Sequence, residues 1–252
     1  MTTGGDVASL VNLGSQSLPP GGLAVVIGAT GGIGQALSAL LRTDARFTHT
    51  LALSRHAVGP FSIPTDITAE ASIEAAARAV AALDAPLRLV IVATGFLHGD
   101  GHAPEKALRQ VSAAHLQHAF AVNVIGPALV MKHFLPLLAP QGKTAFAVLS
   151  ARVGSIGDNQ LGGWYTYRSC KAALNQMLHT AAIELKRSRP QALCVALHPG
   201  TVNTGLSSPF AKTGLDVQTP AESAQRLLGV LDDLSADASG GFFDQMGRVV
   251  AW

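Results

Sequence analysis

The sequence predicts a single-domain α/β fold, a doubly wound parallel sheet with helices on both faces. Two observations lead to this prediction. Short apolar, β-branched runs typical of buried strands alternate with longer stretches of helical pattern, which favours parallel strands joined by crossover helices. The length of 252 residues fits one domain with a full core and a ligand cleft.

The first half of the chain holds three expected strands. Residues 23–27 form a β-branched run that Gly28 ends, and 35–42 are expected to be helical. The second strand is expected at 49–53. Residues 69–83 are rich in alanine and amphipathic, hence helical. The third strand is expected at 87–93, ended by Gly95.

The second half continues the alternation. A long helix is expected at about 112–138, a strand at 144–149 and a helix at about 165–187. A strand at 192–197 stops at Pro199 and Gly200, a helix covers 220–234, and 241–244 form a last short strand. The polar segment 207–218, which contains Phe210, is expected to be a mobile lid over the substrate.

Composition excludes several classes of protein. Apolar residues make up 48 % and charged residues 13 %, unlike a disordered chain. There are 18 basic and 16 acidic residues and no basic block, so no nucleic-acid partner is expected. The charge-free stretch 7–41 is broken by prolines and glycines, and the N-terminus lacks a signal-peptide pattern, so no membrane partner is expected.

The N-terminal segment and the two cysteines indicate the domain boundaries and the cellular compartment. Residues 1–21 are expected to be a flexible N-terminal extension, and 22–252 one domain. Two cysteines, Cys170 and Cys194, make no disulfide framework, which favours a reducing cytoplasm. His98 and His102 lie in a glycine-rich loop without enough neighbouring ligands, so no metal site is predicted.

A glycine-rich turn follows the first strand directly. Gly28, Gly31, Gly32 and Gly34 fit two spacings, Gly-x-x-x-Gly-x-Gly and Gly-x-x-Gly-x-x-Gly, so the turn alone assigns no subfamily. Between a strand and a helix, such glycines let a pyrophosphate approach the backbone and the positive end of the helix dipole. The sequence therefore predicts a dinucleotide site of the Rossmann type.

The end of the second strand predicts the choice of dinucleotide. An acidic residue there would bind the ribose 2′-hydroxyl and repel a 2′-phosphate. This chain has Arg55 between Ser54 and His56, and a guanidinium can pair with a phosphate through two hydrogen bonds. NADP(H) is therefore favoured over NAD(H), with a solvated loop arginine as the alternative.

Tyr167 and Lys171 lie four residues apart on an expected helix, hence on one face. A lysine near a phenol stabilises the phenolate and lowers the pKa of the tyrosine. The tyrosine can then exchange a proton with a substrate oxygen while a hydride moves to carbon.

With these motifs the chain resembles the short-chain dehydrogenase/reductase family from residue 23 to Trp252. The motifs appear in the family's order: the glycine turn, Asn123 with Gly126, the Ser150 region, the Tyr167 and Lys171 pair, and the run from Pro199 to Thr204. A closer resemblance is to C-factor-like and sniffer-type carbonyl reductases, in the runs 149–156, 162–168 and 241–252.

The resemblance implies roles for individual residues. Tyr167 would be the general acid, Lys171 would lower its pKa and hold the ribose, Ser150 would bind the carbonyl oxygen, and Asn123 would organise a water chain. Phe96 and Trp164 are candidate walls of an apolar substrate pocket. The cofactor contacts would come from the following residues: Gly28, Thr30, Gly31, Gly32, Ile33, Gly34, Arg55, Asp66, Ile67, Ala93, Thr94, Gly95, Tyr167, Lys171, Pro199, Gly200, Val202 and Thr204.

Three positions depart from the family pattern. Ala93 takes an asparagine position after the third strand, and Ile27 a position where threonine is frequent. Three residues before Gly154 stands Ala151 where a serine is expected. Ser150 is the preferred catalytic serine because it follows the fourth strand, and Ser155 is the alternative.

The sequence therefore predicts an NADPH-dependent reductase of small apolar aldehydes or ketones. Two alternatives remain: a C-factor-type signalling protein that binds the cofactor with little turnover, and a sugar-nucleotide epimerase, for which the chain is short. The two long helices, 112–138 and 165–187, predict a homodimer or homotetramer.

Overall fold

The computed structural model describes residues 18–56, 59–99, 101–210 and 217–252. It contains a seven-stranded sheet in the order β3-β2-β1-β4-β5-β6-β9, with every neighbouring pair parallel. The strands are β1 (Gly22–Ile27), β2 (Phe47–Ser54), β3 (Ser62–Pro64), β4 (Leu87–Val92), β5 (Thr144–Leu149), β6 (Ala192–His198) and β9 (Phe242–Asp244). The doubly wound α/β fold is confirmed.

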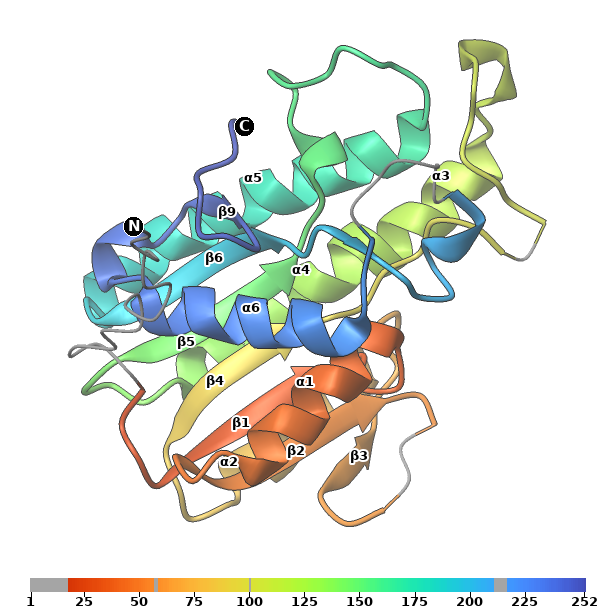
Figure 1. Ribbon diagram of the computed structural model, residues 1–252. Coiled ribbons are helices and arrows are strands. Elements are labelled where there is room, and N and C mark those ends of the chain that lie inside the picture. The colour runs from red at the N-terminus through yellow and green to blue at the C-terminus, as the bar shows by residue number, and fades with distance from the viewer. Residues whose placement is uncertain (1–17, 57–58, 100, 211–216) are drawn as a thin grey trace, which may run out of the picture.

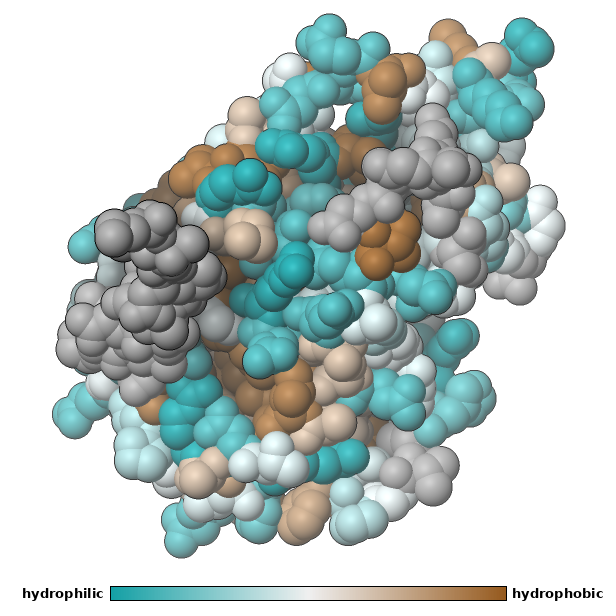
Figure 2. Space-filling view, viewed as in Figure 1, coloured by the Kyte–Doolittle hydropathy of each residue, from teal (hydrophilic) through white to brown (hydrophobic). Residues whose placement is uncertain are grey.

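Helices cover both faces of the sheet (Figure 1). The helices are α1 (Gly32–Thr43), α2 (Glu70–Ala81), α3 (Ala113–Phe120), α4 (Gly126–Phe134), α5 (Tyr165–Ser188) and α6 (Pro220–Asp233). Helices α1 and α6 pack together on one face, whereas α2, α4 and α5 form the other layer. Figure 2 shows hydrophilic side chains over α6, whereas hydrophobic ones show over part of α1.

Two apolar cores follow from the alternation of side chains along the strands. Phe146 and Val148 of β5 face the layer of α4 and α5, while Ala145 and Ala147 face α1 and α6. Because the chain runs outward from β1 to β3 and then crosses back to β4, the strand order reverses between β1 and β4. In such sheets the carboxyl ends of the strands at the reversal form the ligand crevice.

The long helix expected at 112–138 is interrupted. Between α3 and α4 the backbone makes a π-helical turn, Ala121–Ile125, and a 3-10 turn, Leu135–Leu137, follows α4. The first residue of α4 is Gly126. A glycine is needed at this position because a Cβ would lie 2.6 Å from the main-chain oxygen of Ile67. The stretch Ala113–Leu137 is long and apolar enough to cross a membrane by length and composition alone, but Val130, Met131 and Phe134 lie in the core.

Several expected boundaries change. Leu18, within the extension expected at 1–21, is buried in the core beside α1 and α6. Residues 1–17 lie outside the described residues. The expected lid 207–218 falls partly on residues 211–216, also outside them. Its last two residues form β8 (Val217–Gln218), which pairs with β7 (Thr201–Val202). Sequence patterns missed β3, β7 and β8 because each is only two or three residues long.

Candidate active site

The glycine turn joins β1 to α1 at the reversal of the strand order. Gly28 has a φ of +86°, and a Cβ there would lie 2.9 Å from the backbone of Ala93 and Thr94. A Cβ on Gly34 would clash with the carbonyl oxygen of Gly28. A Cβ on Gly32 would come within 2.8 Å of Thr204 Cγ2, whereas a Cβ on Gly31 would lie 3.4 Å from the Gly28 carbonyl oxygen, an ordinary contact distance. Gly28, Gly32 and Gly34 are therefore required by packing, which favours the Gly-x-x-x-Gly-x-Gly spacing.

The first turn of α1 fits a pyrophosphate. Its N-cap, Gly31, has no side chain that could accept from the first N–H groups, and these groups lie at the positive end of the helix dipole. Across the crevice Thr94 Oγ1 is buried without a hydrogen-bond partner among the described residues. Ile33 lies in this first turn, and Gly95 continues the loop that carries Thr94.

A cavity of about 220 Å³ lies beside the turn, between α1 and the ends of β2 and β3. Its walls are Ala29, Thr30, Gln35, Ser38, Arg42, Ala52, Ser54 and Ser62. Arg42 is the charged residue among them. Arg55, which the sequence favoured, lies exposed in the turn after β2 and is not in this wall. Arg42 was missed because a basic residue in the last turn of a helix normally caps that helix.

Asp66 and Ile67 follow β3. The Asp66 carboxylate accepts hydrogen bonds from the Thr68 amide at 2.9 Å and the Thr68 hydroxyl at 2.7 Å. These bonds lower the pKa of Asp66, so the group is ionised and can still accept from an amine. Ile67 is buried against Gly126, which fixes the loop.

The run after β6 closes the crevice opposite the glycine turn. Gly200 has a φ of +81°, and Val202 is buried. The carbonyl oxygen of Pro199 accepts from Ser223 Oγ on α6 at 3.1 Å. Thr204 lies against Gly32, so the two ends of the expected cofactor site are brought together.

Tyr167 and Lys171 lie on one face of α5, at the carboxyl end of β5. Lys171 Nζ donates to the carbonyl oxygen of Leu149 at 2.9 Å and lies 5.6 Å from the centroid of the Tyr167 ring. Burial lowers the pKa of Lys171 to about 8. Burial also raises the pKa of the Tyr167 phenol well above its ordinary value. Burial therefore acts on the Tyr167 pKa in the opposite direction to the lowering expected from Lys171.

Asn123 lies in the π-helical turn and holds the loop after β4. Its side chain accepts from the Phe96 amide at 2.9 Å and donates to the carbonyl oxygens of Phe96 at 2.9 Å and Ala119 at 3.0 Å. Proteins often place such π turns at functional sites. The side chain thus clamps the loop that begins with Ala93, Thr94 and Gly95.

The two candidate serines differ in their partners. Ser150 is buried directly after β5, and its Oγ donates to Asn175 Oδ1 on α5 at 2.6 Å. Ser155 Oγ donates to the carbonyl oxygen of Trp252 at 3.4 Å. Both serines follow residues that lie against Lys171. Leu149 accepts a hydrogen bond from Lys171 Nζ, and a Cβ on Gly154 would lie 2.6 Å from Lys171 Cβ. The Ser150 hydroxyl must leave Asn175 before it can donate to a substrate oxygen.

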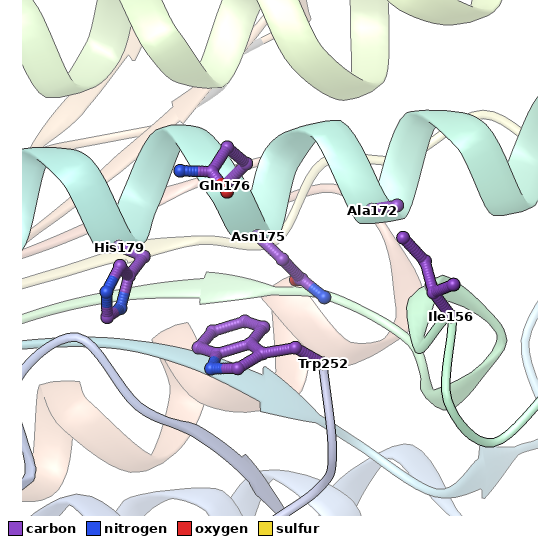
Figure 3. A pocket seen from close by; sticks show the side chains of 7 residues that line it. Ile156, Ala172, Asn175, Gln176, His179 and Trp252 are labelled. Atoms are coloured by element: carbon purple, nitrogen blue, oxygen red, sulfur yellow. The ribbon is translucent and has the colours of Figure 1, made fainter.

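Asn175 also borders a cavity of about 270 Å³ (Figure 3). The side chains of Ile156, Gln176, His179 and Trp252 surround it, and Tyr167 is not among its lining residues. Asn175 Nδ2 is buried without a partner among the described residues. The pairing of Ser150 with Asn175 joins residues 25 positions apart, so no local sequence pattern signals it.

The two predicted pocket walls lie in different surroundings. The Trp164 ring lies 6.2 Å from the Tyr167 ring and 5.3 Å from the Phe210 ring, which in turn is 5.3 Å from His98. Phe96 instead packs edge-on against His118, with ring centroids 4.4 Å apart. Trp164 thus borders the reaction site with Phe210, whereas Phe96 belongs to a cluster at the start of α3. No group of three metal-ligating side chains occurs within the described ranges.

The chain is similar to several known proteins. A family model described as enoyl-(acyl carrier protein) reductase matches residues 31–232. The C-signal protein of Myxococcus xanthus is 36 % identical over 148 residues, covering 58 % of this chain and 84 % of that protein. The 1-hydroxy-2-glutathionyl-2-methyl-3-butene dehydrogenase of Rhodococcus sp. strain AD45 is 29 % identical over 187 residues, covering 74 % and 78 %.

Solved structures share the fold over nearly the whole chain. The NADPH-bound carbonyl reductase from chicken fatty liver superposes with a TM-score of 0.81 at 26 % identity, covering 96 % of this chain and 97 % of that one. The carbonyl reductase Sniffer of D. melanogaster has a TM-score of 0.79 at 22 % identity, covering 92 % and 100 %.

Proposed function

Because the chain belongs to the short-chain dehydrogenase/reductase family and is an oxidoreductase of the carbonyl reductase type, we propose that it reduces an aldehyde or ketone to an alcohol with NADPH. The observation that carries this proposal is the Tyr167 and Lys171 pair, buried at the carboxyl end of β5. It faces a crevice whose glycine turn and uncapped helix fit a dinucleotide.

The chain's own groups supply the acid. When bound, the reduced nicotinamide supplies a hydride to the carbonyl carbon. Tyr167 gives its phenolic proton to the carbonyl oxygen, so that an alcohol forms and a phenolate remains. The phenol is protonated at neutral pH, which is the form that donates a proton in the reduction. The ammonium group of Lys171, close to the ring, stabilises the phenolate until solvent returns the proton.

The preference for NADPH rests on charge. Arg42 lines the cavity beside the glycine turn, and Arg55 lies just beyond the end of β2. No carboxylate is among the residues that line that cavity. A 2′-phosphate there would gain charge-assisted hydrogen bonds from a guanidinium. The chicken carbonyl reductase of the same fold was solved with NADPH, which supports the same cofactor here.

A C-signal-type protein with little turnover is the second candidate. The identity of 36 % to C-signal favours it. The engagement of Ser150 with Asn175 also favours it, because the hydroxyl that would stabilise the carbonyl oxygen is already donated. The intact Tyr167 and Lys171 pair favours the reductase.

Turnover of a panel of aldehydes and ketones with NADPH tests the proposal. Tyr167→Phe removes the acid, so we expect kcat to fall by about 10²–10⁴-fold, while NADPH affinity measured by fluorescence stays unchanged. Tyr165→Phe is the matched control, because Tyr165 opens the same helix but is 39 % exposed. NADPH binding without reduction of any carbonyl would favour the C-signal type. Full turnover in Tyr167→Phe would refute the assigned acid.

Assembly into a homodimer or homotetramer is part of the same proposal. Ile125 before α4 and Met177 and Ile183 on α5 expose large apolar side chains. Burying these groups against a second copy would remove apolar surface from water. Light scattering at micromolar concentration is expected to give a multiple of 25.9 kDa, and a monomer would contradict this.

A further inference from the structure

Glu105 is a buried carboxylate that the proposed chemistry does not use. It lies in the loop between β4 and α3, and only 2 % of its surface is exposed. Oε2 accepts the Thr166 amide N–H at 3.2 Å, Oε1 accepts the Thr166 hydroxyl, and His115 Nδ1 on α3 lies 3.0 Å from Oε1. A buried carboxylate is costly unless it is paired and hydrogen-bonded. Every partner named here comes from α3 or from the first turn of α5.

The first turn of α5 lacks a cap of its own. Its N-cap residue, Trp164, adopts a left-handed conformation with φ 53° and ψ 40°, and no side-chain hydrogen bond caps the helix there. An indole ring has no acceptor for the free N–H groups that begin a helix. Glu105 supplies that acceptor from 61 residues away, and its carbonyl oxygen also accepts the Trp164 N–H. A negative charge at this end is favoured by the helix dipole.

His115 and its neighbours fix the carboxylate from the opposite side. The His115 ring stacks on His102 with centroids 4.7 Å apart and meets the edge of Phe96 at 6.1 Å. The Phe96 backbone is held in turn by Asn123. Burial works to raise the pKa of Glu105, but the hydrogen bonds from Thr166 hold it below its usual value, so the group stays ionised.

Tyr167 follows Thr166 directly. Its ring lies 6.2 Å from the Trp164 ring and 5.6 Å from Lys171 Nζ. Because Tyr167 is the next residue of the helix, the position of its phenol depends on the backbone of the turn that Glu105 caps. We propose that Glu105 is a positioning residue for Tyr167: it caps the first turn of α5 from the β4–α3 loop and so sets where the phenol lies. This inference rests on the proposed function.

The experiment compares two variants at one site. Glu105→Leu keeps the approximate volume but removes both acceptors, so the turn loses its cap. Glu105→Gln retains one acceptor oxygen for the Thr166 N–H and serves as the rescue. A displacement of about 1 Å at a reacting group can cost about 100-fold in rate. We expect kcat with NADPH and a reducible carbonyl to fall by about 10–100-fold in Glu105→Leu. In Glu105→Gln it is expected to stay near the wild-type value, while KM and the NADPH Kd of both variants change little.

A second pair of variants covers the case in which Glu105→Leu does not fold. Thr166→Val removes the hydroxyl donor and is expected to lower kcat, whereas Thr166→Ser keeps the donor and the rate. Glu222→Leu is the control for loss of a helix cap elsewhere. Glu222 caps the first turn of α6 through Thr219, and no proposed catalytic residue lies in that turn. We expect this variant to lose stability but retain kcat.

Amide hydrogen exchange separates this inference from the proposed function. If the wild type reduces no carbonyl, the proposed function fails, but exchange in the first turn of α5 still reports on the cap. Faster exchange there in Glu105→Leu, with the last turn of α5 unchanged, would support the capping. Wild-type kcat together with wild-type exchange in Glu105→Leu would overturn the inference. So would a loss of NADPH affinity equal to the loss of kcat, because Glu105 would then hold the fold as a whole.

Discussion

Lys171 gives the prediction that the structure defines best. Its ammonium group is buried, and burial lowers its pKa from 10.5 to about 8. Replacing it by methionine, Lys171→Met, removes a buried charge and keeps an unbranched chain of similar length. The variant loses the hydrogen bond to Leu149, a cost that does not depend on pH.

The magnitude follows from proton linkage. Between about pH 8 and 10.5 the unfolded wild type binds a proton that the folded chain does not, so wild-type stability rises with pH in this range. Below pH 8 the full penalty of the shifted pKa is present, about 3 kcal/mol. By pH 9.5 the linkage leaves about 1 kcal/mol of this penalty. The stability of Lys171→Met relative to wild type should therefore fall by about 2 kcal/mol between pH 7 and pH 9.5.

Urea unfolding at half-unit steps from pH 7 to 9.5 measures this difference. The buried thiol of Cys194 titrates in both proteins, so its contribution cancels in the comparison. The charge of Lys171 lowers the pKa of Cys170, so both proteins carry Cys170→Ala. Lys132→Met is the control: Lys132 is exposed and paired with Glu70, which raises its pKa, so a flat difference is expected in this window. A constant difference for Lys171→Met would show that Lys171 titrates as a free lysine and would refute the desolvation argument.

Three further predictions test the cofactor site and the serine. Arg42→Ala and Arg55→Ala are compared by fluorescence titration with NADPH and NADH. The variant that removes the guanidinium at the 2′-phosphate is expected to weaken NADPH but not NADH binding by about 10–100-fold. Equal losses for both dinucleotides would contradict the assignment. Gly34→Ala places a Cβ against the Gly28 carbonyl oxygen. It should lower the free energy of unfolding, measured in urea, by about 1–3 kcal/mol. Gly31→Ala, where a Cβ would lie 3.4 Å from that oxygen, is its neutral control, and similar losses would argue against the packing role. Ser150→Ala is expected to lower kcat, whereas Ser155→Ala should retain it. Ser150→Ala is also expected to lower the free energy of unfolding by about 1–3 kcal/mol, because it leaves Asn175 Oδ1 unpaired. The reverse order of rates would identify Ser155 as the catalytic serine.

Local patterns in the sequence determined most of the fold. Buried strands and amphipathic helices are encoded by the periodicity of neighbouring residues, and glycine or proline marks their ends. The longer strands β1, β2, β4, β5 and β6 and the helices α1, α2, α5 and α6 could therefore be located within a few residues. The glycine turn and the spacing of Tyr167 and Lys171 are also local. A turn that must approach β4 closely, and two side chains that must share a helix face, leave a signature a few residues long.

Only the tertiary structure decided which distant groups meet. The Glu105 carboxylate contacts Thr166, Ser150 contacts Asn175, and Arg42 turns toward the end of β2, and each pair is brought together by the crossing of the chain between layers. The same holds for the acidity of Tyr167. A lysine four residues away predicts a lowered pKa, but the depth at which α5 lies against the sheet decides the sign, because the cost of desolvation depends on everything packed around the phenol.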